Sequence, residues 1–357
     1  MNALLNAADE AVALELLHNL GCTDGLPVII PTPERVARLV LASGLDADIK
    51  LGEMGPGDGA ATIDKIAANA VMAGCQADDM PIVVAVVRAI LQPEFDLGEV
   101  QATTHSTAPL VIVNGPAARH AGIVGGFGAL GPGHRANATI GRAVRLCMMN
   151  IGVARPGVSD MALLGHPGKF SFCLAEDETN SPWAPLHTDF GHSAADSAVT
   201  VLGTEGPHSV LFANDADDAD SPQRLLRCLA AVIANTGSNN ANFGGGAVAV
   251  ALNPEHAVVL AEAGLDRTQV QVELHRLATN SRARLRALNP GFVRAGHDDD
   301  LIHSVRSPND LVVFVAGGSG LYSAVFPSWA AGAHLNPVVH EPIVTGEACE
   351  LPWASSR

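Results

Sequence analysis

Residues 125–146 form the segment whose residue types best suit a chemical role. They read GGFGALGPGHRANATIGRAVRL, in which Gly126, Gly128 and Gly131 have the G-x-G-x-x-G spacing of a dinucleotide-binding loop. That fingerprint requires a strand directly before the loop, whereas the strand expected here ends at Val113. We therefore expect a glycine-rich loop whose backbone N–H groups face an anionic ligand just before a helix.

The helix expected after this loop, residues 136–150, has arginines along one side. Arg135, Arg142 and Arg145 share that side, and guanidinium groups bind carboxylates or phosphates with two hydrogen bonds. We predict that Arg135, with His134 beside it, and Arg142 bind the anionic end of a small molecule. The alternative is a solvated face that pairs with surface acids, which is the role expected for Arg145.

A histidine, a cysteine and a serine are the candidates for a chemical step. His105, in ATTHSTAP, is a candidate general base, or else a histidine that satisfies a turn. Cys75 lies between two expected helices, where it is either a nucleophile activated by the second helix or a core residue. Ser319, in AGGSGLYS, is a second candidate nucleophile in an expected strand-to-helix turn. The N–H groups of three glycines would hold an oxyanion there: Gly317, Gly318 and Gly320.

Three further polar residues adjoin distinctive strings and are predicted to bind the substrate. They are Asn114 in VNGP, Lys169 in GHPGKF and Asn239 in TGSNNANFGGG. The alternative for each glycine-rich string is a tight turn whose backbone needs a positive φ. We predict no tightly bound transition metal, because the chain has no cysteine pair and no His-x-x-x-His spacing. If a metal were bound, its ligands would be His166, Cys173 and His187.

The order of apolar runs and helical patterns predicts an α/β fold built from βα modules. PVIIPTPERVARLVLASGLD, from Pro27, and VAVALNPEHAVVLAEAGLD, from Val248, each predict a strand, a helix and a Gly-Leu-Asp exit. These two strings form a possible internal repeat. The length of 357 residues predicts two lobes. We place an N-terminal lobe, with the glycine loop and the arginine helix, at residues 1–165 and a C-terminal lobe at residues 166–357.

Composition and charge exclude several classes of partner. The chain is 48% hydrophobic and 16% charged, which is typical of a globular protein, and its net charge of −16 repels phosphate groups. We therefore expect neither a nucleic-acid nor a membrane partner. The first basic residue is Arg35, and the six cysteines are scattered, so we expect a cytoplasmic protein without a secretory signal or disulfide framework. We also expect a homo-oligomer.

Several strings in this chain resemble an uncharacterised bacterial family associated with UGSC-type (seleno)proteins. They span roughly residues 24–265 and read DGLPV, NAVMAGC, QATTH, VNGP, LGPGHRANATIGRA, GHPGKFSFC, SPWAPLH and GSNN. The resemblance implies that these strings form a site, with thiol or redox chemistry nearby. It implies no particular reaction and no catalytic residue, and the chain contains no UGSC string.

These features together predict an enzyme that needs no nicotinamide, flavin or other cofactor. The expected activity is that of a hydrolase or lyase acting on a small anionic molecule, either a carboxylate-bearing or a carbonyl substrate. One alternative is a non-catalytic binding or carrier protein, which needs the arginines and glycines but no base. The other is a thiol-redox partner, which the lack of a Cys-x-x-Cys pair disfavours.

Overall fold

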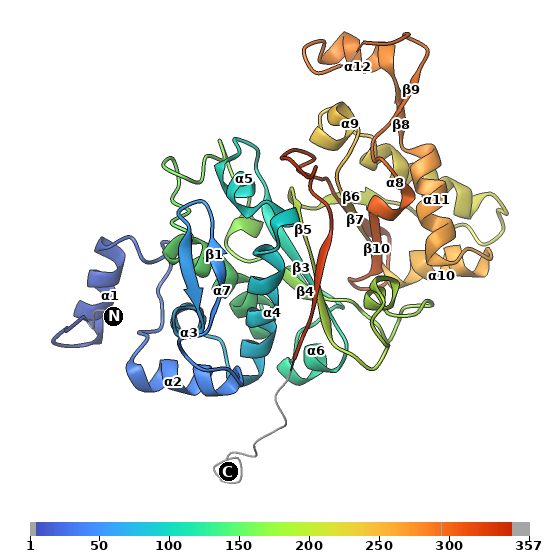
Figure 1. Ribbon diagram of the computed structural model, residues 1–357. Helices are drawn as coiled ribbons and strands as arrows, with labels where there is room; N and C mark the ends of the chain where they lie inside the picture. Colours follow the sequence, from blue (N-terminus) through green and yellow to red (C-terminus); the bar gives the residue numbers. More distant parts are fainter. Residues whose placement is uncertain (1–4, 294, 345–357) are drawn as a thin grey trace.

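The computed structural model describes residues 5–293 and 295–344 (Figure 1). Its first four-stranded sheet has the order β12-β5-β3-β4. β3 runs parallel to β4 and antiparallel to β5, and β12 lies at the edge beside β5. The bounds of these strands are β3 (Ala108–Asn114), β4 (Cys173–Ala175), β5 (Ala198–Thr204) and β12 (Val339–Pro342). β3 and β5 are buried along their whole length, because other layers cover both faces of this sheet.

The second four-stranded sheet has the order β10-β7-β11-β6. β7 runs parallel to β10, and β11 runs antiparallel to both β7 and β6. The bounds are β6 (His208–Leu211), β7 (Val248–Leu252), β10 (Leu311–Val315) and β11 (Tyr322–Phe326). Alternate residues of the two sheets share one apolar layer, in which Leu110 and Ile112 join Ala249 and Phe314. The two sheets therefore pack face to face.

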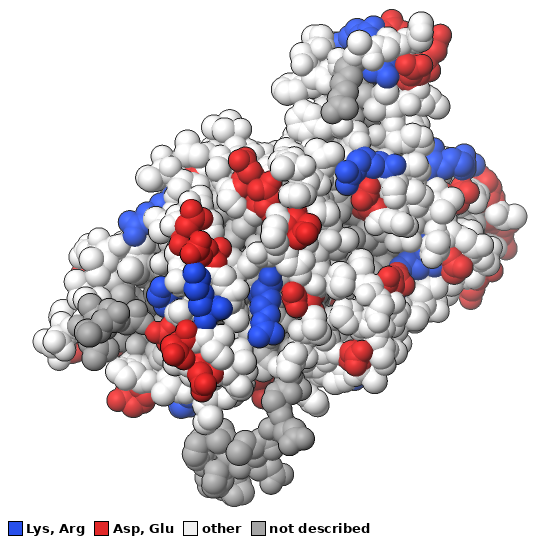
Figure 2. Space-filling view, in the orientation of Figure 1, with Lys and Arg blue, Asp and Glu red and all other residues white. Residues whose placement is uncertain are grey.

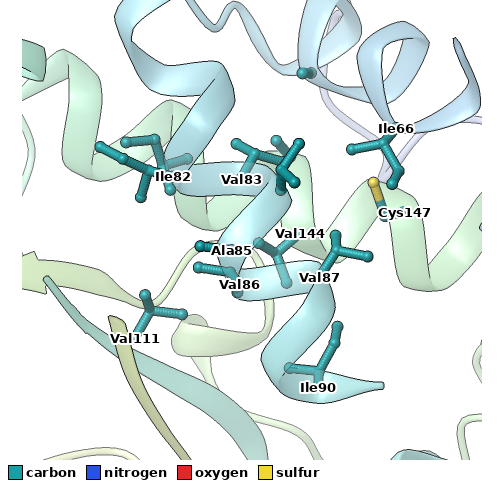
Figure 3. Close-up of a cluster of buried hydrophobic side chains, with 14 of the residues drawn as sticks. Ile66, Ile82, Val83, Ala85, Val86, Val87, Ile90, Val111, Val144 and Cys147 are labelled. Atoms are coloured by element: carbon teal, nitrogen blue, oxygen red, sulfur yellow. The ribbon is translucent and has the colours of Figure 1, made fainter. Parts of the chain in front are cut away.

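Helices cover the outer face of each sheet, so that the molecule has four layers (Figure 1). The helices over the first sheet are α3 (Ile63–Ala73), α4 (Met80–Ile90) and α7 (Arg135–Asn150). Those over the second sheet are α8 (Ser221–Ile233), α10 (Pro254–Glu262) and α11 (Arg267–Leu277). Figure 3 shows side chains of α4 packed between Val111 of β3 and residues of α3 and α7. Small and β-branched side chains form most of this interface, which allows the helices to lie close to the sheet.

The remaining elements lie around these layers. They are α1 (Glu10–Asn19), α2 (Pro33–Ala42), β1 (Lys50–Met54), β2 (Gly59–Thr62), α5 (Leu97–Ala102), α6 (Pro116–Ala121), α9 (Asn239–Phe243), β8 (Thr279–Ser281), α12 (Arg282–Leu288) and β9 (Leu301–His303). β8, β9 and α12 form an arm that projects from the second half of the chain (Figure 1). No helix within residues 5–293 or 295–344 is long and apolar enough to cross a membrane.

The structure confirms the predicted α/β class but corrects one half of the proposed repeat. β7 and α10 form the expected βα unit, and Asn253 caps α10 by accepting a hydrogen bond from the His256 N–H. In the other string, α2 forms as expected, but residues 27–30 form no strand. The Ile29 N–H donates instead to the Met72 carbonyl at the end of α3, and no strand of the described chain pairs with this segment.

The first sheet takes strands from both sides of the predicted division between residues 165 and 166. β4, β5 and β12 all come after residue 165, yet they complete the sheet that contains β3. The final strand, β12, returns from the second half of the chain to pair with β5.

Acidic and basic side chains are interspersed on the face drawn in Figure 2.

Candidate functional site

Two of the predicted site residues, His105 and Asn114, lie at opposite ends of β3. His105 comes just before this strand, whereas Asn114 is its last residue. Seven residues of extended chain span about 20 Å. Ser319 lies at the Asn114 end, because it follows β10. The segment after β4 joins the end of β10 to the end of β3. There the Glu176 N–H donates to the Val113 carbonyl of β3 at 3.2 Å, and the Asp177 N–H donates to the Val315 carbonyl of β10 at 2.8 Å.

The glycine-rich loop that begins at Gly125 meets the glycines at positions 317, 318 and 320 at the Asn114 end of β3. The Gly317 N–H donates to the Gly125 carbonyl at 2.7 Å, so this N–H is not available to an oxyanion. A Cβ atom on Gly318 would lie 2.0 Å from the ring of Phe127, which explains why the position needs glycine. Gly317 and Gly320 adopt positive φ, at 94° and 146°. The positive φ of Gly317 and Gly320 agrees with the tight-turn interpretation, and glycine at position 318 also allows two loops to pack closely.

The prediction of a strand-to-helix turn at residues 316–323 is wrong. After Gly320 the chain enters β11, because Tyr322 resumes pairing with Leu211 of β6. Ser319 is exposed in this turn, and its side chain makes no hydrogen bond with the described part of the chain. The turn thus lacks the helix N-terminus that was expected to assist an oxyanion site.

Acidic residues surround Asn114. Its Nδ2 donates to Glu176 at 2.6 Å and to Glu178 at 3.1 Å, and Arg267 lies 3.3 Å from Glu176. Burial raises the pKa of the Glu176 carboxyl, although the charge of Arg267 opposes that shift. This buried network holds the sheet ends together and leaves Asn114 facing carboxylates, which disfavours the binding of an anion there.

The glycine junction yields a test on two neighbouring residues. A Cβ atom on Gly125 would lie 2.6 Å from the Ala175 carbonyl oxygen, whereas nothing lies closer than 4.0 Å to one on Gly126. We expect Gly125→Ala to lower the free energy of unfolding by about 1–3 kcal/mol through overpacking. Gly126→Ala is expected to stay within about 0.5 kcal/mol of the parent. Urea unfolding measures both, and equal losses would contradict the packing explanation.

The three arginines of α7 have three different environments. Arg135 is exposed and makes no ion pair among the described residues. Arg142 holds Asp24 with two hydrogen bonds, of 2.7 and 2.8 Å, so its guanidinium is already occupied. Arg145 is buried and pairs with Asp160 at 2.5 Å, so the expected surface role of Arg145 is wrong. Asp160 supplies the buried partner for its charge.

The other predicted binding residues are also held by the protein. His134 Nε2 lies 3.0 Å from the Phe127 carbonyl, at the start of α7. The Lys169 ammonium donates to the Thr107 carbonyl at 3.1 Å and lies 3.1 Å from Asp160. The Asn239 amide donates to the Trp329 carbonyl at 2.9 Å. These contacts give each of the three residues a structural role.

Cys75 is buried between α3 and α7. Its thiol donates to the Thr139 carbonyl at 3.4 Å. Burial, followed by the charge of Asp79, raises the pKa of the Cys75 thiol well above its usual range. A nucleophilic cysteine needs the opposite shift, so this environment favours the core interpretation.

At the other end of β3, His105 forms a cluster with two residues that the sequence analysis missed. His105 Nε2 lies 2.9 Å from one carboxylate oxygen of Glu205, and His208 Nε2 lies 3.4 Å from the other. Antiparallel pairing of β3 with β5 places Ala108 opposite Thr204, which brings residue 105 beside residue 205. The string TEGPHS directly after a buried strand was the available signal.

Glu205 carries the negative charge of this cluster. Burial by itself raises the pKa of Glu205, but the hydrogen bond and charge of His105 and the charge of His208 outweigh it and hold the pKa below its usual range. Glu205 is therefore an anion at neutral pH. The other ring nitrogen of His105, Nδ1, is buried without a hydrogen-bond partner among the described residues.

His166 lies close enough to His105 and Glu205 for their charges to act on it. Burial first, and then the charge of Lys169, lower the pKa of His166 to about 4. Its Nδ1 accepts a hydrogen bond from the Gly168 N–H at 3.1 Å, so the ring proton is on Nε2. His166 is thus a neutral imidazole beside the pair of His105 and Glu205.

The lowered pKa of His166 also predicts part of the pH dependence of the protein's stability. Between its pKa of about 4 and the ordinary value of 6.5, the unfolded chain binds a proton that the folded chain does not. Stability contributed by neutral His166 is therefore lost as the pH falls through this interval. His166→Asn keeps an acceptor for Gly168 but does not titrate, so the slope of unfolding free energy against pH should decrease by up to about 1 kcal/mol per pH unit. Urea unfolding at several pH values measures the slope, and an unchanged slope would contradict this assignment.

A hollow of about 550 Å³ opens beside this cluster, with His208 in its lining. β6, α8, the end of α11 and the start of α12 surround it. Arg227 and Arg284 line it, and no acidic residue is among its described lining residues. Arg227 pairs with Asp220 at 3.0 Å, but both side chains are more than half exposed, so the pair is weak. The hollow is therefore a positively charged part of an acidic protein.

The described ranges contain no group of three or more histidine, cysteine, aspartate or glutamate side chains that could hold a metal ion. His166, Cys173 and His187 therefore do not form such a group.

No protein-family model matches the chain, and no curated protein matches it at a significant level.

Proposed function

We propose that this protein is a cofactor-independent hydrolase or lyase that acts on a small carboxylate-bearing or carbonyl substrate in the hollow beside His208. The observation that carries the proposal is the sequence of contacts from His105 through Glu205 to His208 at the edge of a hollow that contains two arginines. A carboxylate between two imidazoles is an arrangement that orients a general base and stabilises its protonated form.

His208 is the member of this cluster that meets the substrate, because it lines the hollow. In the proposed reaction it takes a proton from water or from the carbon beside a carbonyl group. The Glu205 anion would then stabilise the imidazolium that forms, and His105 would hold the other carboxylate oxygen in place. The separation of 3.4 Å between His208 and Glu205 is typical of a catalytic pair before substrate binds.

Arg227 and Arg284 define the class of substrate. A hollow of about 550 Å³ has the size of a small-molecule site. Arg284 makes no side-chain ion pair with described residues, and the exposed pair of Arg227 with Asp220 is weak enough for a ligand to replace. A guanidinium prefers a planar anion with two oxygens, which favours a carboxylate.

The first experiment measures binding of simple carboxylates, such as acetate, malonate and succinate, by ligand-observed NMR. Replacing Arg284 by alanine removes a charge-assisted contact worth about 1.5–3 kcal/mol, so affinity should fall about ten- to a hundredfold. Arg286→Ala is the matched control on the same helix, since Arg286 pairs with Asp298 and does not line the hollow. Equal effects of the two substitutions would contradict the proposed substrate site.

A second measurement distinguishes an enzyme from a carrier. His208→Asn and Glu205→Gln should abolish turnover in a screen of small carboxylate and carbonyl compounds while sparing their binding. Absence of any turnover by the parent protein, with binding retained, would favour the carrier alternative. The thiol-redox alternative has less support, because Cys75, Cys147 and Cys173 are buried and burial raises the pKa of each thiol.

A further inference from the structure

Helix α1 carries more apolar surface than its own chain covers. None of its residues is buried, and Leu14 and Leu17 only partly pack on the core. A second apolar stripe, at a different angle around the helix, consists of residues spaced four apart, Val12, Leu16 and Leu20. Val12 and Leu20 are 49% and 46% exposed. Figure 1 shows α1 at the outer edge of the molecule.

An apolar groove of about 820 Å³ lies next to α1. Its lining is mainly apolar, from Leu17 of α1, α2 and Met72 of α3, and it also contains the charged side chains of Asp46, Asp64 and Lys65. Leu41 is 62% exposed. Within one chain, α1 therefore borders the groove without filling it.

We propose that two copies of this chain form a symmetric dimer in which the outer stripe of each α1 packs in the groove of the other copy. A stripe and a groove beside each other on one surface are self-complementary, because a two-fold axis places each helix over the partner's groove. An amphipathic helix that lies in an apolar groove is a common mode of recognition. This inference is independent of the function proposed for the hollow.

The exposed apolar side chains of residues 5–41 limit such an interface to a small one. Large apolar side chains in residues 5–41 that are 46–62% exposed are Leu5, Val12, Leu20, Leu26, Ile29 and Leu41. If each loses roughly 50–100 Å², the six side chains of each copy bury about 600–1,200 Å² in the dimer, the size of a small, reversible interface. The proposed dimer should therefore dissociate on dilution.

The test is the mass in solution, measured by sedimentation or by light scattering over a range of concentrations. The parent chain should shift from the 36.7 kDa monomer to twice that mass as the concentration rises. Val12→Lys and Leu41→Asp each place a charge in the buried contact and should weaken the dimer by at least about tenfold. Both side chains are exposed in the monomer, so the variants should fold. Leu288→Asp, at a 56% exposed position on α12, is the control and should leave the dimer intact.

Mixing the two weakened variants tests the reciprocal geometry. In a mixed dimer, the Val12→Lys helix meets the Leu41→Asp groove, while the other helix and groove are both of parent sequence. The mixture should therefore dimerise more strongly than either variant alone. A parent protein that stays monomeric at high micromolar concentration would overturn the proposal. So would a dimer that survives both substitutions, or a mixture that shows no recovery.

Discussion

Replacing Arg267 by methionine is expected to lower the free energy of unfolding by about 3–5 kcal/mol. Arg267 begins α11, and its side chain is only 5% exposed. It lies 3.3 Å from the buried Glu176 and donates to Asp189 at 2.9 Å and to the Ala184 carbonyl. Methionine fills a similar volume but leaves Glu176 as an unpaired carboxylate in the interior, which accounts for the size of the effect.

The control for this prediction lies on the same helix. Arg276 is 60% exposed and pairs with Glu273 at 2.7 Å, so Arg276→Met should change stability by less than about 1 kcal/mol. Acidification gives a second measurement. Burial already raises the pKa of Glu176, and loss of Arg267 raises this pKa further. Because protonation then relieves the buried charge in the folded state, the deficit of Arg267→Met should shrink as the pH falls. A small or pH-independent deficit in urea unfolding would contradict this account.

The second large effect is expected for Arg142, which the sequence pattern assigned to ligand binding. Arg142→Leu should destabilise the protein by about 3 kcal/mol, because it removes two hydrogen bonds to Asp24. The Asp24 side chain is only 3% exposed, so its charge would remain buried and unpaired. Arg142 also donates to the Pro27 carbonyl at 2.9 Å and so fixes the segment that leads into α2.

Arg135→Leu is the matched control on α7. Arg135 is exposed at the first position of the helix and makes no ion pair among the described residues, so stability should change by less than about 0.5 kcal/mol. Lysine at position 142 should restore only part of the loss, since an ammonium cannot make the two-pronged contact with Asp24. Equal stabilities of the Arg142→Leu and Arg135→Leu variants would show that the pair of Arg142 with Asp24 does not stabilise the fold.

The proposed site combines the hollow beside His208 with a cluster of residues that are far apart in the chain. His105 and Glu205 are 100 residues apart, and Arg284 lies on a different element again. His105 stands out in the sequence between threonines and a serine, but nothing in the sequence pairs it with Glu205. That pairing depends on the antiparallel register of β3 and β5, which neither strand specifies alone.

Local signals determined most of the individual elements. Thr32 with Pro33, and Asn253 with Pro254, each predict a helix start, and the structure has both caps. The buried strands β3 and β10 follow from short apolar runs between turn residues. The run at residues 27–30 looks the same in sequence but forms no strand, because a strand also requires a hydrogen-bonding neighbour, and the described residues supply none there.

The sequence by itself thus determined the α/β class, the helix starts and the special status of the glycine strings, because these depend on residues close together in the chain. Only the tertiary structure decided what the polar side chains do. Arg135, Arg142 and Arg145 share one side of a helix in sequence, yet one is exposed, one holds Asp24 and one is buried with Asp160. The partner of a charged side chain is set by distant segments that fold against it, so its role cannot be inferred from helical spacing alone.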